Sequence, residues 1–433
     1  MTKLKIASIK ALEILDSRGQ PTVAVTVVLN NGVSGQAKVP SGASTGSHEA
    51  VELRDQDLAH YQGLGVLTAL KNITEIIQPA LLGHDPVKQT EIDEIMLALD
   101  GTPNKSKLGA NAILAVSLAT ARAAANGLGQ PLYEYLAKFN PDFQGHYLLP
   151  VPMMNVLNGG KHANWATDIQ EYLILPVGAK TMAEAVCVGA EVYRSLKKVL
   201  QDHSYSSLIG DEGGFAPAVK SNKETFDLLV EAVHASGHQL GQEIIFGIDA
   251  AATEFYQAGV YHLKKEKRTL TGAELSIFYE DLQKQFPIYS WEDIFSEDDW
   301  TSFQQFTSRH QADSQIVGDD LYVTDLKRLN RGIQEKTTNS ILIKLNQVGT
   351  VSETIQAILR ARSAGLTAVV SHRSGETEDT FIADLTVALG TGQIKTGAPA
   401  RSERTAKYNR LLEIEAELGS RASYASFPFP LKH

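Results

Sequence analysis

Six ionisable residues in the second half of the chain each stand directly after a short, mainly apolar run. They are Asp249, Glu292, Asp319, Lys344, His372 and Lys395, and the steps between them are 43, 27, 25, 28 and 23 residues. A strand, a helix and two turns need roughly 25–30 residues, and buried parallel strands read as continuous Val/Ile/Leu runs. In a closed (β/α)8 barrel the carboxyl ends of the strands converge on one mouth. We therefore expect these six side chains to face one another.

The three carboxylates of this series, Asp249, Glu292 and Asp319, indicate a metal site. Carboxylates that meet in one pocket repel one another unless a cation neutralises them, and hard oxygen ligands select Mg²⁺ or Mn²⁺ over zinc or copper. The alternative is that each residue is only a turn residue or the N-cap of the next helix. Their occurrence at three successive strand ends favours the metal site.

Lys344 follows a buried strand, where a cation is costly unless it has a partner or a function. Near a metal and a second lysine its pKa is expected to fall, which would suit a general base. The alternative is a structural ion pair with one of the three carboxylates. His372 and Arg373 lie in a polar loop, residues 371–377, where the arginine offers two parallel donors to a phosphate or carboxylate. The alternative for that loop is a hydroxyl-rich helix cap.

Three glycine-containing loops supply further candidates. Residues 210–217 are an acidic segment that includes Glu212, and glycine permits the close approach of a ligand, although this could be an ordinary turn. Residues 40–46 have the composition of a phosphate or metal loop, but they lack the Gly-Lys-Ser/Thr ending that nucleotide binding requires. Residues 158–164 contain His162 and give only a weak signal, because a lone histidine is more often structural than catalytic.

The elements that must position these residues divide the chain near residue 140. Residues 5–39 predict a three-stranded β start with a hairpin turn at residues 30–32, and residues 61–136 show a helical pattern. We expect a smaller α+β domain over residues 1–140. Beyond it, apolar segments alternate with amphipathic helices, which predicts a (β/α)8 barrel over residues 141–433.

The composition narrows the functional class. A formal charge of −10, from 50 acidic and 40 basic residues, disfavours a nucleic-acid surface. Cys187 is the only cysteine, which excludes an intrachain disulfide, and we expect it to pack in the core. Residues 108–128 are rich in alanine but carry polar side chains, so we expect a buried helix and no membrane span. Because the N-terminus lacks an apolar core of signal-peptide length, we expect a cytoplasmic protein.

Together these segments resemble the enolase family over essentially the whole chain. The matching segments are residues 13–19, 41–46, 108–114, 210–217, 317–321, 344–350, 371–379 and 395–407. Each motif is weak alone, whereas the ordered series is very specific. The resemblance implies an α/β fold of enolase type, in which a smaller α+β domain precedes a barrel with the order ββαα(βα)6. We expect the first, 43-residue step to hold an extended helix–loop insertion around residues 256–286.

The resemblance also implies roles for the metal and acid–base residues. The three strand-end carboxylates would bind a first Mg²⁺, and Ser44, on a mobile loop, would bind a second Mg²⁺ that arrives with substrate. Lys344 would be the general base. Glu212 would be the general acid that helps the hydroxyl group to leave, with Glu171 beside it.

Further residues match the family's substrate contacts. They are Gln170, His162, His372, Arg373, Ser374 and Lys395, with Arg373 and Ser374 on the phosphate. The chain departs from the family pattern without losing any of these groups. The departures are Trp291 and Ile294 beside Glu292, and Lys161 and Trp165 beside His162.

The implied activity is the Mg-dependent, reversible dehydration of 2-phosphoglycerate to phosphoenolpyruvate in glycolysis and gluconeogenesis. Lysine would abstract the α-proton and glutamate would assist loss of hydroxide, through a metal-stabilised enolate. The family also implies a homodimer, or an octamer built as a tetramer of dimers. Two alternatives are another dehydratase or racemase of the superfamily, and a non-catalytic structural or surface-binding protein. A member of the family without catalytic activity should have lost some of Glu171, Glu212, Lys344 or Lys395, and all four are present.

Overall fold

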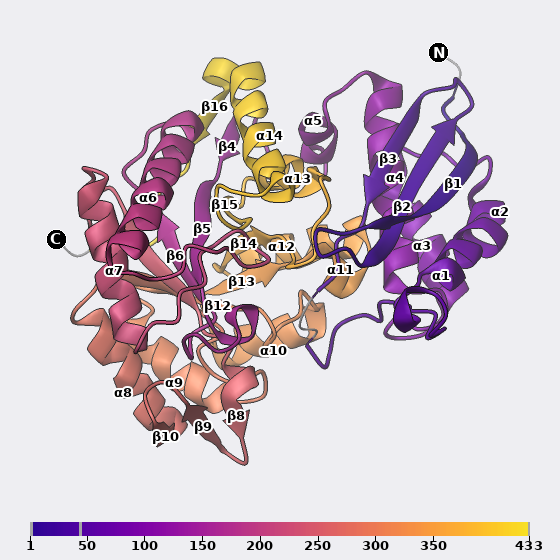
Figure 1. Cartoon of the computed structure of the whole chain (residues 1–433). Coiled ribbons are helices and arrows are strands. Elements are labelled where there is room, and N and C mark those ends of the chain that lie inside the picture. Colours follow the sequence, from indigo (N-terminus) through magenta and orange to yellow (C-terminus); the bar gives the residue numbers. More distant parts are fainter. Residues whose placement is uncertain (1–2, 43–45, 432–433) are drawn as a thin grey trace.

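The computed structural model describes residues 3–42 and 46–431, which form a small N-terminal domain beside a closed barrel (Figure 1). The N-terminal domain begins with an antiparallel sheet in the order β1–β2–β3. Its strands are β1 (Ile6–Leu15), β2 (Pro21–Leu29) and β3 (Ser34–Lys38). The turn between β2 and β3 contains Gly32 at φ 84°, which glycine adopts without a steric penalty. The three strands and the hairpin predicted for residues 5–39 are confirmed.

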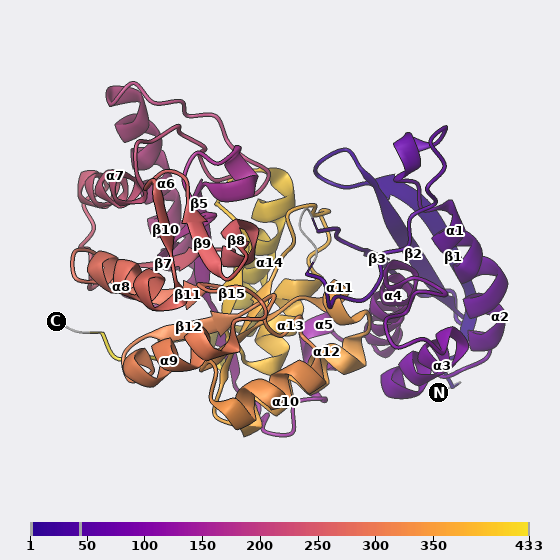
Figure 2. The ribbon, with the colours of Figure 1, turned by 90° about the horizontal axis from the view of Figure 1, so that it is seen from below.

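Helices follow the sheet in the N-terminal domain, as predicted. They are η1 (Tyr61–Gly63), α1 (Leu67–Asn72), η2 (Ile73–Ile77), α2 (Gln78–Leu81), α3 (Gln89–Asp100), α4 (Ala110–Leu128) and α5 (Leu132–Ala137). α4 packs on β2 and β3 and also contacts two helices of the barrel domain, α11 (Leu345–Val348) and α12 (Val351–Ser363) (Figure 2). The sheet can approach α4 closely because β3 has Gly35, where a Cβ would lie 2.1 Å from the backbone nitrogen of Ala123.

α4 is buried along most of its length, which confirms the prediction of a core helix. Among residues 3–42 and 46–431, no helix combines the length and the apolar character that crossing a bilayer would require.

Eight strands close the barrel in the order β11–β12–β13–β14–β15–β5–β6–β7. They are β5 (Val151–Asn158), β6 (Glu171–Leu175), β7 (Ile245–Asp249), β11 (Ile288–Glu292), β12 (Gln315–Gly318), β13 (Ser340–Ile343), β14 (Thr367–Ser371) and β15 (Gly392–Lys395). β6 runs antiparallel to both of its neighbours, and all other neighbouring pairs are parallel.

Helices surround the barrel and connect its strands. They are α6 (Met182–Asp202), α7 (Asn222–Ala235), α8 (Gly272–Gln283), α9 (Trp300–His310), α10 (Leu326–Glu335), α11 (Leu345–Val348), α12 (Val351–Ser363), α13 (Phe381–Leu389) and α14 (Ser402–Leu418). Short 3-10 segments are η3 (Gly160–Ala163), η4 (Ala252–Phe255) and η5 (Gly419–Arg421). Because β6 is followed by two helices before β7, the order is ββαα(βα)6, and the predicted fold class is confirmed.

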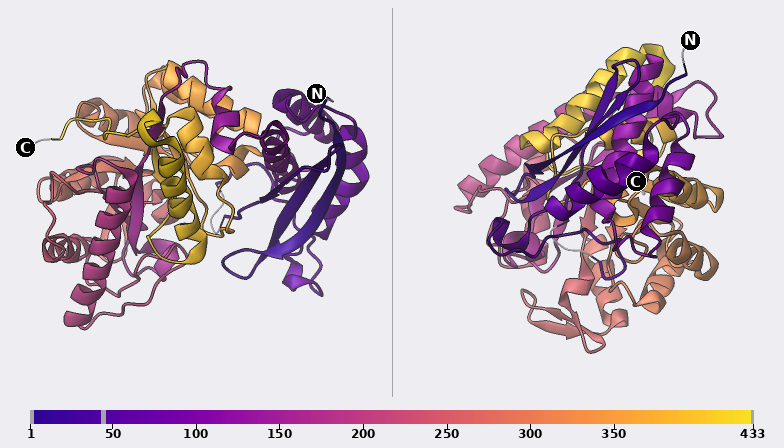
Figure 3. Two further views of the ribbon diagram at one scale, coloured as in Figure 1. Left: turned by 90° about the horizontal axis from the view of Figure 1, so that it is seen from above. Right: turned by 90° about the vertical axis from the view of Figure 1, so that its right-hand side faces the viewer.

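A pair of parallel strands, β4 (Tyr147–Leu149) and β16 (Ala422–Tyr424), joins the start of the barrel domain to the end of the chain. Figure 3 shows the two ends of the chain on opposite sides of the molecule. The proposed boundary near residue 140 falls between α5 and β4. The division into residues 1–140 and 141–433 stays a proposal.

The long step between β7 and β11 differs in part from the predicted helix–loop insertion. It holds a small antiparallel sheet before α8, made of β8 (Tyr256–Gln257), β9 (Val260–Leu263) and β10 (Arg268–Leu270). Along β9 half-buried residues alternate with buried Tyr261 and Leu263, which is the period of a strand. Ala258 and Gly259, both at positive φ, form the tight turn between β8 and β9. This short alternation was the signal that sequence reasoning missed.

Cys187 is exposed on α6, so the prediction that it packs in the core is wrong. α6 is amphipathic, and its buried positions include Ala185, Val188, Gly189 and Val192. Cys187 lies outside this stripe, because positions three and four apart share one face of a helix. Its apolar neighbours in the sequence therefore did not indicate burial.

Strand alternation also places Trp291 and Glu292 on opposite faces of β11. Trp291 is fully buried and packs against Tyr279 of α8 and Phe306 of α9, outside the barrel. Glu292 points into the barrel, where it contacts Lys395. Trp291 therefore belongs to the layer between strands and helices and does not line the mouth.

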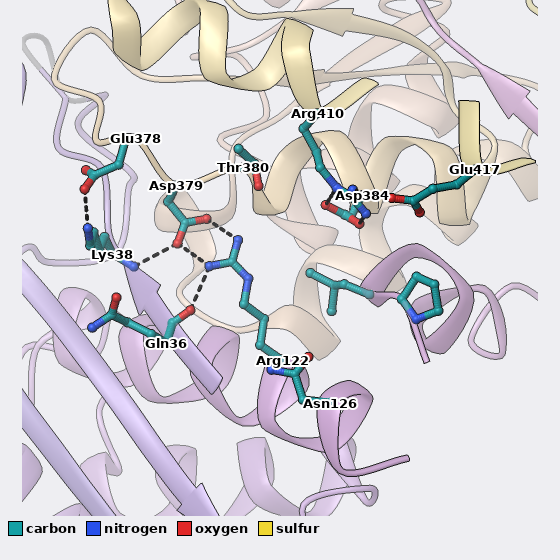
Figure 4. A pocket seen from close by; sticks show the side chains of 12 residues that line it. Gln36, Lys38, Arg122, Asn126, Glu378, Asp379, Thr380, Asp384, Arg410 and Glu417 are labelled. Carbon is teal, nitrogen blue, oxygen red and sulfur yellow. Dashed lines mark hydrogen bonds and ion pairs between the residues drawn. The ribbon is translucent and has the colours of Figure 1, made fainter. Parts of the chain in front are cut away.

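The two domains are joined by a half-buried ion pair, which Figure 4 shows. The two terminal guanidinium nitrogens of Arg122, on α4, each lie 2.7 Å from an oxygen of Asp379, and the backbone N–H of Lys38 donates to the same carboxylate at 2.9 Å. A cavity of about 570 Å³ lies beside this pair, and its charged side chains are engaged with one another. The contact holds β3 and α4 against the segment that precedes α13.

Candidate active site at the barrel mouth

The mouth of the barrel brings together the residues that the sequence analysis singled out. β7, β11 and β15 end at Asp249, Glu292 and Lys395, and residues 319, 344 and 372 come directly after β12, β13 and β14. Because β6 is antiparallel, its first residue, Glu171, lies at the same mouth, opposite Asp249 in the ladder. The residues lining the pocket include His162, Gln170, Glu171, Glu212, Asp249, Asp319, Lys344, His372, Arg373, Ser374 and Lys395. Ser44 lies outside the described residues.

Lys395 occupies the centre of the carboxylate cluster. Its ammonium nitrogen lies 2.7 Å from Glu292 Oε1, 2.9 Å from Asp249 Oδ2 and 3.1 Å from Glu171 Oε2. Burial would lower the pKa of this lysine, but Asp249, Glu171 and Glu292 outweigh burial and raise it well above its usual range. Lys395 is therefore a fixed positive charge at neutral pH.

The carboxylates around Lys395 have the chemistry of a hard-metal site. Burial, together with the neighbouring Asp249, raises the pKa of Glu292 well above its usual range. Glu292 Oε2 is buried and has no hydrogen-bond partner among the described residues. Since a buried, unsatisfied oxygen is costly and these donors are all oxygens, Asp249, Glu292 and Asp319 fit a Mg²⁺-like cation.

Two acidic residues that sequence reasoning missed lie beside Asp319. The carboxylate of Asp293 accepts the backbone N–H of Asp319 at 2.9 Å and that of Asp320 at 2.8 Å, which shapes the turn after β12. Burial, reinforced by Asp319, raises the pKa of Asp320 to about 8. Ligand oxygens of these three residues lie within 4.8 Å of one another and could hold a metal ion. Their signal was a second acidic residue directly after Glu292 and directly after Asp319, where the sequence analysis considered only the first of each pair.

Lys344 forms an ion pair with Asp319, which is the structural alternative considered for it. Burial would lower the pKa of Lys344, but the adjacent Asp319 raises it above its ordinary value. The expectation that this pKa falls beside a metal ion and a second lysine stays a prediction. Gln347 also holds Asp319, because its amide donates to Asp319 Oδ1 at 2.9 Å.

Glu171, Glu212 and His162 form a second group at the mouth. His162 Nδ1 lies 3.8 Å from Glu171 and 3.9 Å from Glu212. Burial and the neighbouring Glu212 raise the pKa of Glu171 well above its usual range. Burial would also raise the pKa of Glu212, but the facing rings of His372 and His162 outweigh it and hold that pKa well below its usual range. The pKa values of these two neighbouring carboxyl groups are therefore shifted in opposite directions.

Asn155 of β5 positions Glu212 from inside the barrel. Its side-chain amide donates to Glu212 Oε2 at 2.9 Å and to Asn158 Oδ1 at 2.6 Å. Asn158 in turn donates to the carbonyl of Gly214, so the acidic loop is fastened to β5 at two points. Buried polar networks of this kind fix side-chain orientation. Sequence reasoning could not find Asn155, because it lies within an apolar run.

Arg404 fixes the tautomer of His372. The buried guanidinium of Arg404, on α14, contacts His372 Nδ1 at 2.6 Å and donates to backbone carbonyls in residues 211 and 373–374. Arginine has no acceptor, so Nδ1 accepts the hydrogen bond and Nε2 carries the hydrogen. Nε2 lies 3.3 Å from Glu212 Oε2. Burial lowers the pKa of His372 to about 3, with Arg404 reinforcing the shift and Glu212 opposing it.

Arg373 is engaged by a carboxylate from the N-terminal domain. Its Nη1 lies 2.9 Å from Glu49 Oε2 and donates to Asn346 Oδ1 at 2.8 Å.

The start of α13 is held by a carboxylate that lies outside residues 371–377. Asp379 accepts the backbone N–H of Phe381 at 2.8 Å there. The alternative interpretation of residues 371–377 as a hydroxyl-rich helix cap is therefore not supported.

Two family models cover nearly the whole chain. The model described as enolase, N-terminal domain, matches residues 6–136, and the model described as enolase, C-terminal TIM barrel domain, matches residues 146–430. The antiparallel second barrel strand and the charged mouth agree with this match. The protein is thus an enzyme of the enolase superfamily, and the chain belongs to the enolase family.

Proposed function

We propose that the chain interconverts 2-phosphoglycerate and phosphoenolpyruvate, as a phosphopyruvate hydratase that depends on Mg²⁺. One observation supports this most strongly. Lys344 follows β13 and Glu171 begins β6, and these strands stand four places apart in a closed ring of eight, so the two residues come from opposite walls of one pocket. An elimination in which the proton and the hydroxyl group leave from opposite faces needs a base and an acid placed in this way.

Lys344 is the proposed general base. It must lose its proton to accept the α-proton of the substrate, and its ion pair with Asp319 opposes that loss. A cation that engages Asp319 would take the partner away from the Lys344 ammonium and lower its pKa, so more of the lysine would be the neutral amine that can accept a proton. Its role therefore depends on the state of the neighbouring carboxylates.

Glu212 and Glu171 are the proposed acid pair. The hydroxyl group is a poor leaving group unless it receives a proton as its bond to carbon breaks. Burial raises the pKa of Glu171 while the neighbouring histidines lower that of Glu212, so Glu171 is the proposed carrier of the proton that this pair supplies. His372 Nε2 lies 3.3 Å from Glu212 Oε2, so the histidine borders this pair.

The proposed ligands of a first Mg²⁺ are Asp249, Glu292 and Asp319, with Ser44 binding a second Mg²⁺ that enters with substrate. When bound, Mg²⁺ supplies concentrated positive charge next to the substrate carboxylate. Lys395 adds a fixed cation at the same place. Loss of the α-proton turns the substrate carboxylate into a dianion, which this charge stabilises.

The remaining contacts of the substrate are also proposals. Arg373 and Ser374 would bind its phosphate, and the other contacts are assigned to Gln170, His162 and His372. We further propose a place in glycolysis and gluconeogenesis, a cytoplasmic location, and assembly as a homodimer or as a tetramer of dimers.

A spectrophotometric assay tests the proposal. Purified protein with 2-phosphoglycerate and MgCl₂ should generate the ultraviolet absorbance of the conjugated enol phosphate, EDTA should abolish it, and excess MgCl₂ should restore it. Acid-sugar substrates should give no turnover. If folded, Mg-loaded protein leaves 2-phosphoglycerate unchanged, the assignment is wrong.

A further inference from the structure

The guanidinium group of Arg373 is already occupied by Glu49. Glu49 Oε2 lies 2.9 Å from Nη1, and Glu49 Oε1 lies 3.2 Å from Nη2. The side chains are 6% and 4% exposed, so water does not separate them. Two oxygens facing two guanidinium nitrogens is also the geometry with which arginine binds a phosphate or carboxylate ligand. Glu49 therefore occupies the anion-binding position on the Arg373 guanidinium, here called the Arg373 seat, that an external ligand would need.

Glu49 belongs to a segment that is fixed at one end and lightly held at the other. The backbone N–H of Ala50 donates to the carbonyl of Gln347 at 2.9 Å, which anchors the chain just after Glu49. On the other side, Ser47 is exposed and donates to Glu297 Oε1 at 2.8 Å. Exposed contacts of this kind contribute little to stability. Displacement of Glu49 therefore moves its side chain and the residues just before Ala50, and it breaks the 3.0 Å hydrogen bond that the backbone N–H of Gly46 donates to Glu49 Oε1.

Competition with Glu49 distinguishes between anions. A carboxylate ligand offers the same charge and the same two oxygens as Glu49, but it must also lose its free translation, whereas Glu49 is tethered beside Arg373. A phosphate monoester carries about −1.5 to −2 charges at pH 7 and three acceptor oxygens, so it gains more from the guanidinium than Glu49 does. A phosphate dianion can therefore displace Glu49 from Arg373, whereas a carboxylate ligand cannot.

We propose that Glu49 is a specificity-determining residue that reserves the Arg373 seat for dianionic phosphate groups by competing with monoanions from within the chain. The consequence for catalysis rests on the proposed function, in which Arg373 binds the substrate phosphate. The competition itself is a property of Arg373 and Glu49 and can be measured without turnover.

Glu52 provides a matched control in the same segment. Its carboxylate accepts from Ser41 Oγ at 3.0 Å and pairs with Arg54. Replacement of Glu52 by glutamine removes one carboxylate from this part of the domain without freeing Arg373. A general effect of negative charge on anion binding would therefore appear equally in Glu49→Gln and Glu52→Gln.

The experiment is calorimetric titration of the wild-type chain and its variants with inorganic phosphate and, separately, with acetate, without added divalent ions. The apparent dissociation constant for phosphate is the intrinsic constant divided by the fraction of molecules in which Glu49 does not occupy Arg373. If Glu49 occupies Arg373 in about nine-tenths of the molecules, its removal tightens phosphate binding about tenfold. We expect Glu49→Gln to show this gain and to acquire measurable acetate binding. We expect Glu52→Gln to match the wild-type chain. Glu49→Ala serves as a second variant if Glu49→Gln does not fold.

Two outcomes separate the failure of this proposal from the failure of the proposed function. If Glu49→Gln binds phosphate no more tightly than the wild-type chain, while additional replacement of Arg373 by glutamine abolishes binding, competition by Glu49 is refuted and the phosphate seat stands. If Glu49→Gln and the Glu49→Gln/Arg373→Gln variant bind phosphate equally, phosphate does not bind Arg373. In that case both the specificity role and the assignment of the phosphate are refuted.

Discussion

Lys395 Nζ lies 2.7 Å from Glu292 Oε1, with the two side chains 3% and 0% exposed at the centre of the barrel mouth. A buried pair of this kind is costly to desolvate and contributes little to net stability, so its retention points to a function. Glu292 has two oxygens, and only one of them faces the lysine. The pair therefore offers both a fixed cation and an oxygen that remains available to a ligand.

The first prediction concerns metal-dependent stability. A cation bound by Asp249, Glu292 and Asp319 stabilises the folded chain, by about 2.7 kcal/mol at a hundredfold excess over its dissociation constant. Calorimetric melting with MgCl₂ or with EDTA should show a Tm increase in the wild-type chain and a smaller one in Glu292→Gln. Glu378→Gln, which alters an exposed carboxylate outside the mouth, should retain the full increase. An equal increase in all three proteins would contradict the proposed ligands.

The second prediction concerns His372 and pH. Its pKa in the folded chain is about 3, below the ordinary value of 6.5, so the unfolded chain binds more protons between these values. His372 therefore favours folding above pH 6.5, and this contribution is lost as the pH falls toward 3. In ¹⁵N-histidine spectra, assigned by comparison with His372→Gln, the His372 nitrogens should not titrate between pH 5.5 and 9. They should show hydrogen on Nε2.

Arg404→Lys is the variant that tests the cause of this tautomer. Lysine keeps the charge on α14 but lacks the planar set of donors that reaches the ring and three backbone carbonyls together. We expect a mixture of both neutral tautomers and a lower kcat, with circular dichroism unchanged. A wild-type His372 with hydrogen on Nδ1, or one that titrates near 6.5, would refute the assignment.

The third prediction concerns the junction between the domains. Arg122→Ala removes the cation from the half-buried Asp379 carboxylate, which we expect to lower the free energy of unfolding by about 1–3 kcal/mol. Urea unfolding should show that cost, and Arg122→Ala/Asp379→Asn should recover part of it. A loss below about 1 kcal/mol, typical of an exposed pair, would mean that the contact does not hold the domains together.

Much of the barrel could be predicted because its strands are buried on both faces. Such strands read as uninterrupted apolar runs, and the ionisable residue that ends each run then marks the mouth. Asp249, Glu292 and Lys395 are the last residues of their strands, as the spacing predicts. The hairpin at Gly32 was readable for a different reason, because its turn requires a positive φ.

The missed features depend on packing between distant segments. β9 and β10 are too short for their alternation to stand out, and Cys187 looked buried only because its sequence neighbours are apolar. The elevated pKa of Lys344 arises from Asp319, which comes from another strand. The pairing of Glu49 with Arg373 joins residues 324 positions apart, and no local sequence pattern predicts it.

The fourth prediction separates the base from the acid. Lys344→Ala should lose exchange of the α-proton of 2-phosphoglycerate with solvent, because no other proposed residue accepts that proton. Glu212→Gln should retain measurable exchange while losing most of the overall dehydration, since removal of the α-proton precedes loss of hydroxide. Proton NMR in D₂O with MgCl₂ follows the exchange directly. Equal loss of exchange in both variants would refute this division of roles.

The most direct measurement of the central claim runs the proposed reaction in reverse. Folded, Mg-loaded protein is incubated with phosphoenolpyruvate in D₂O, and the products are analysed by mass spectrometry and proton NMR. The account predicts 2-phosphoglycerate with one deuterium on its α-carbon, and no product in Lys344→Ala. Unchanged phosphoenolpyruvate with the wild-type protein, under conditions where MgCl₂ raises its Tm, would contradict the claim that this chain is a phosphopyruvate hydratase.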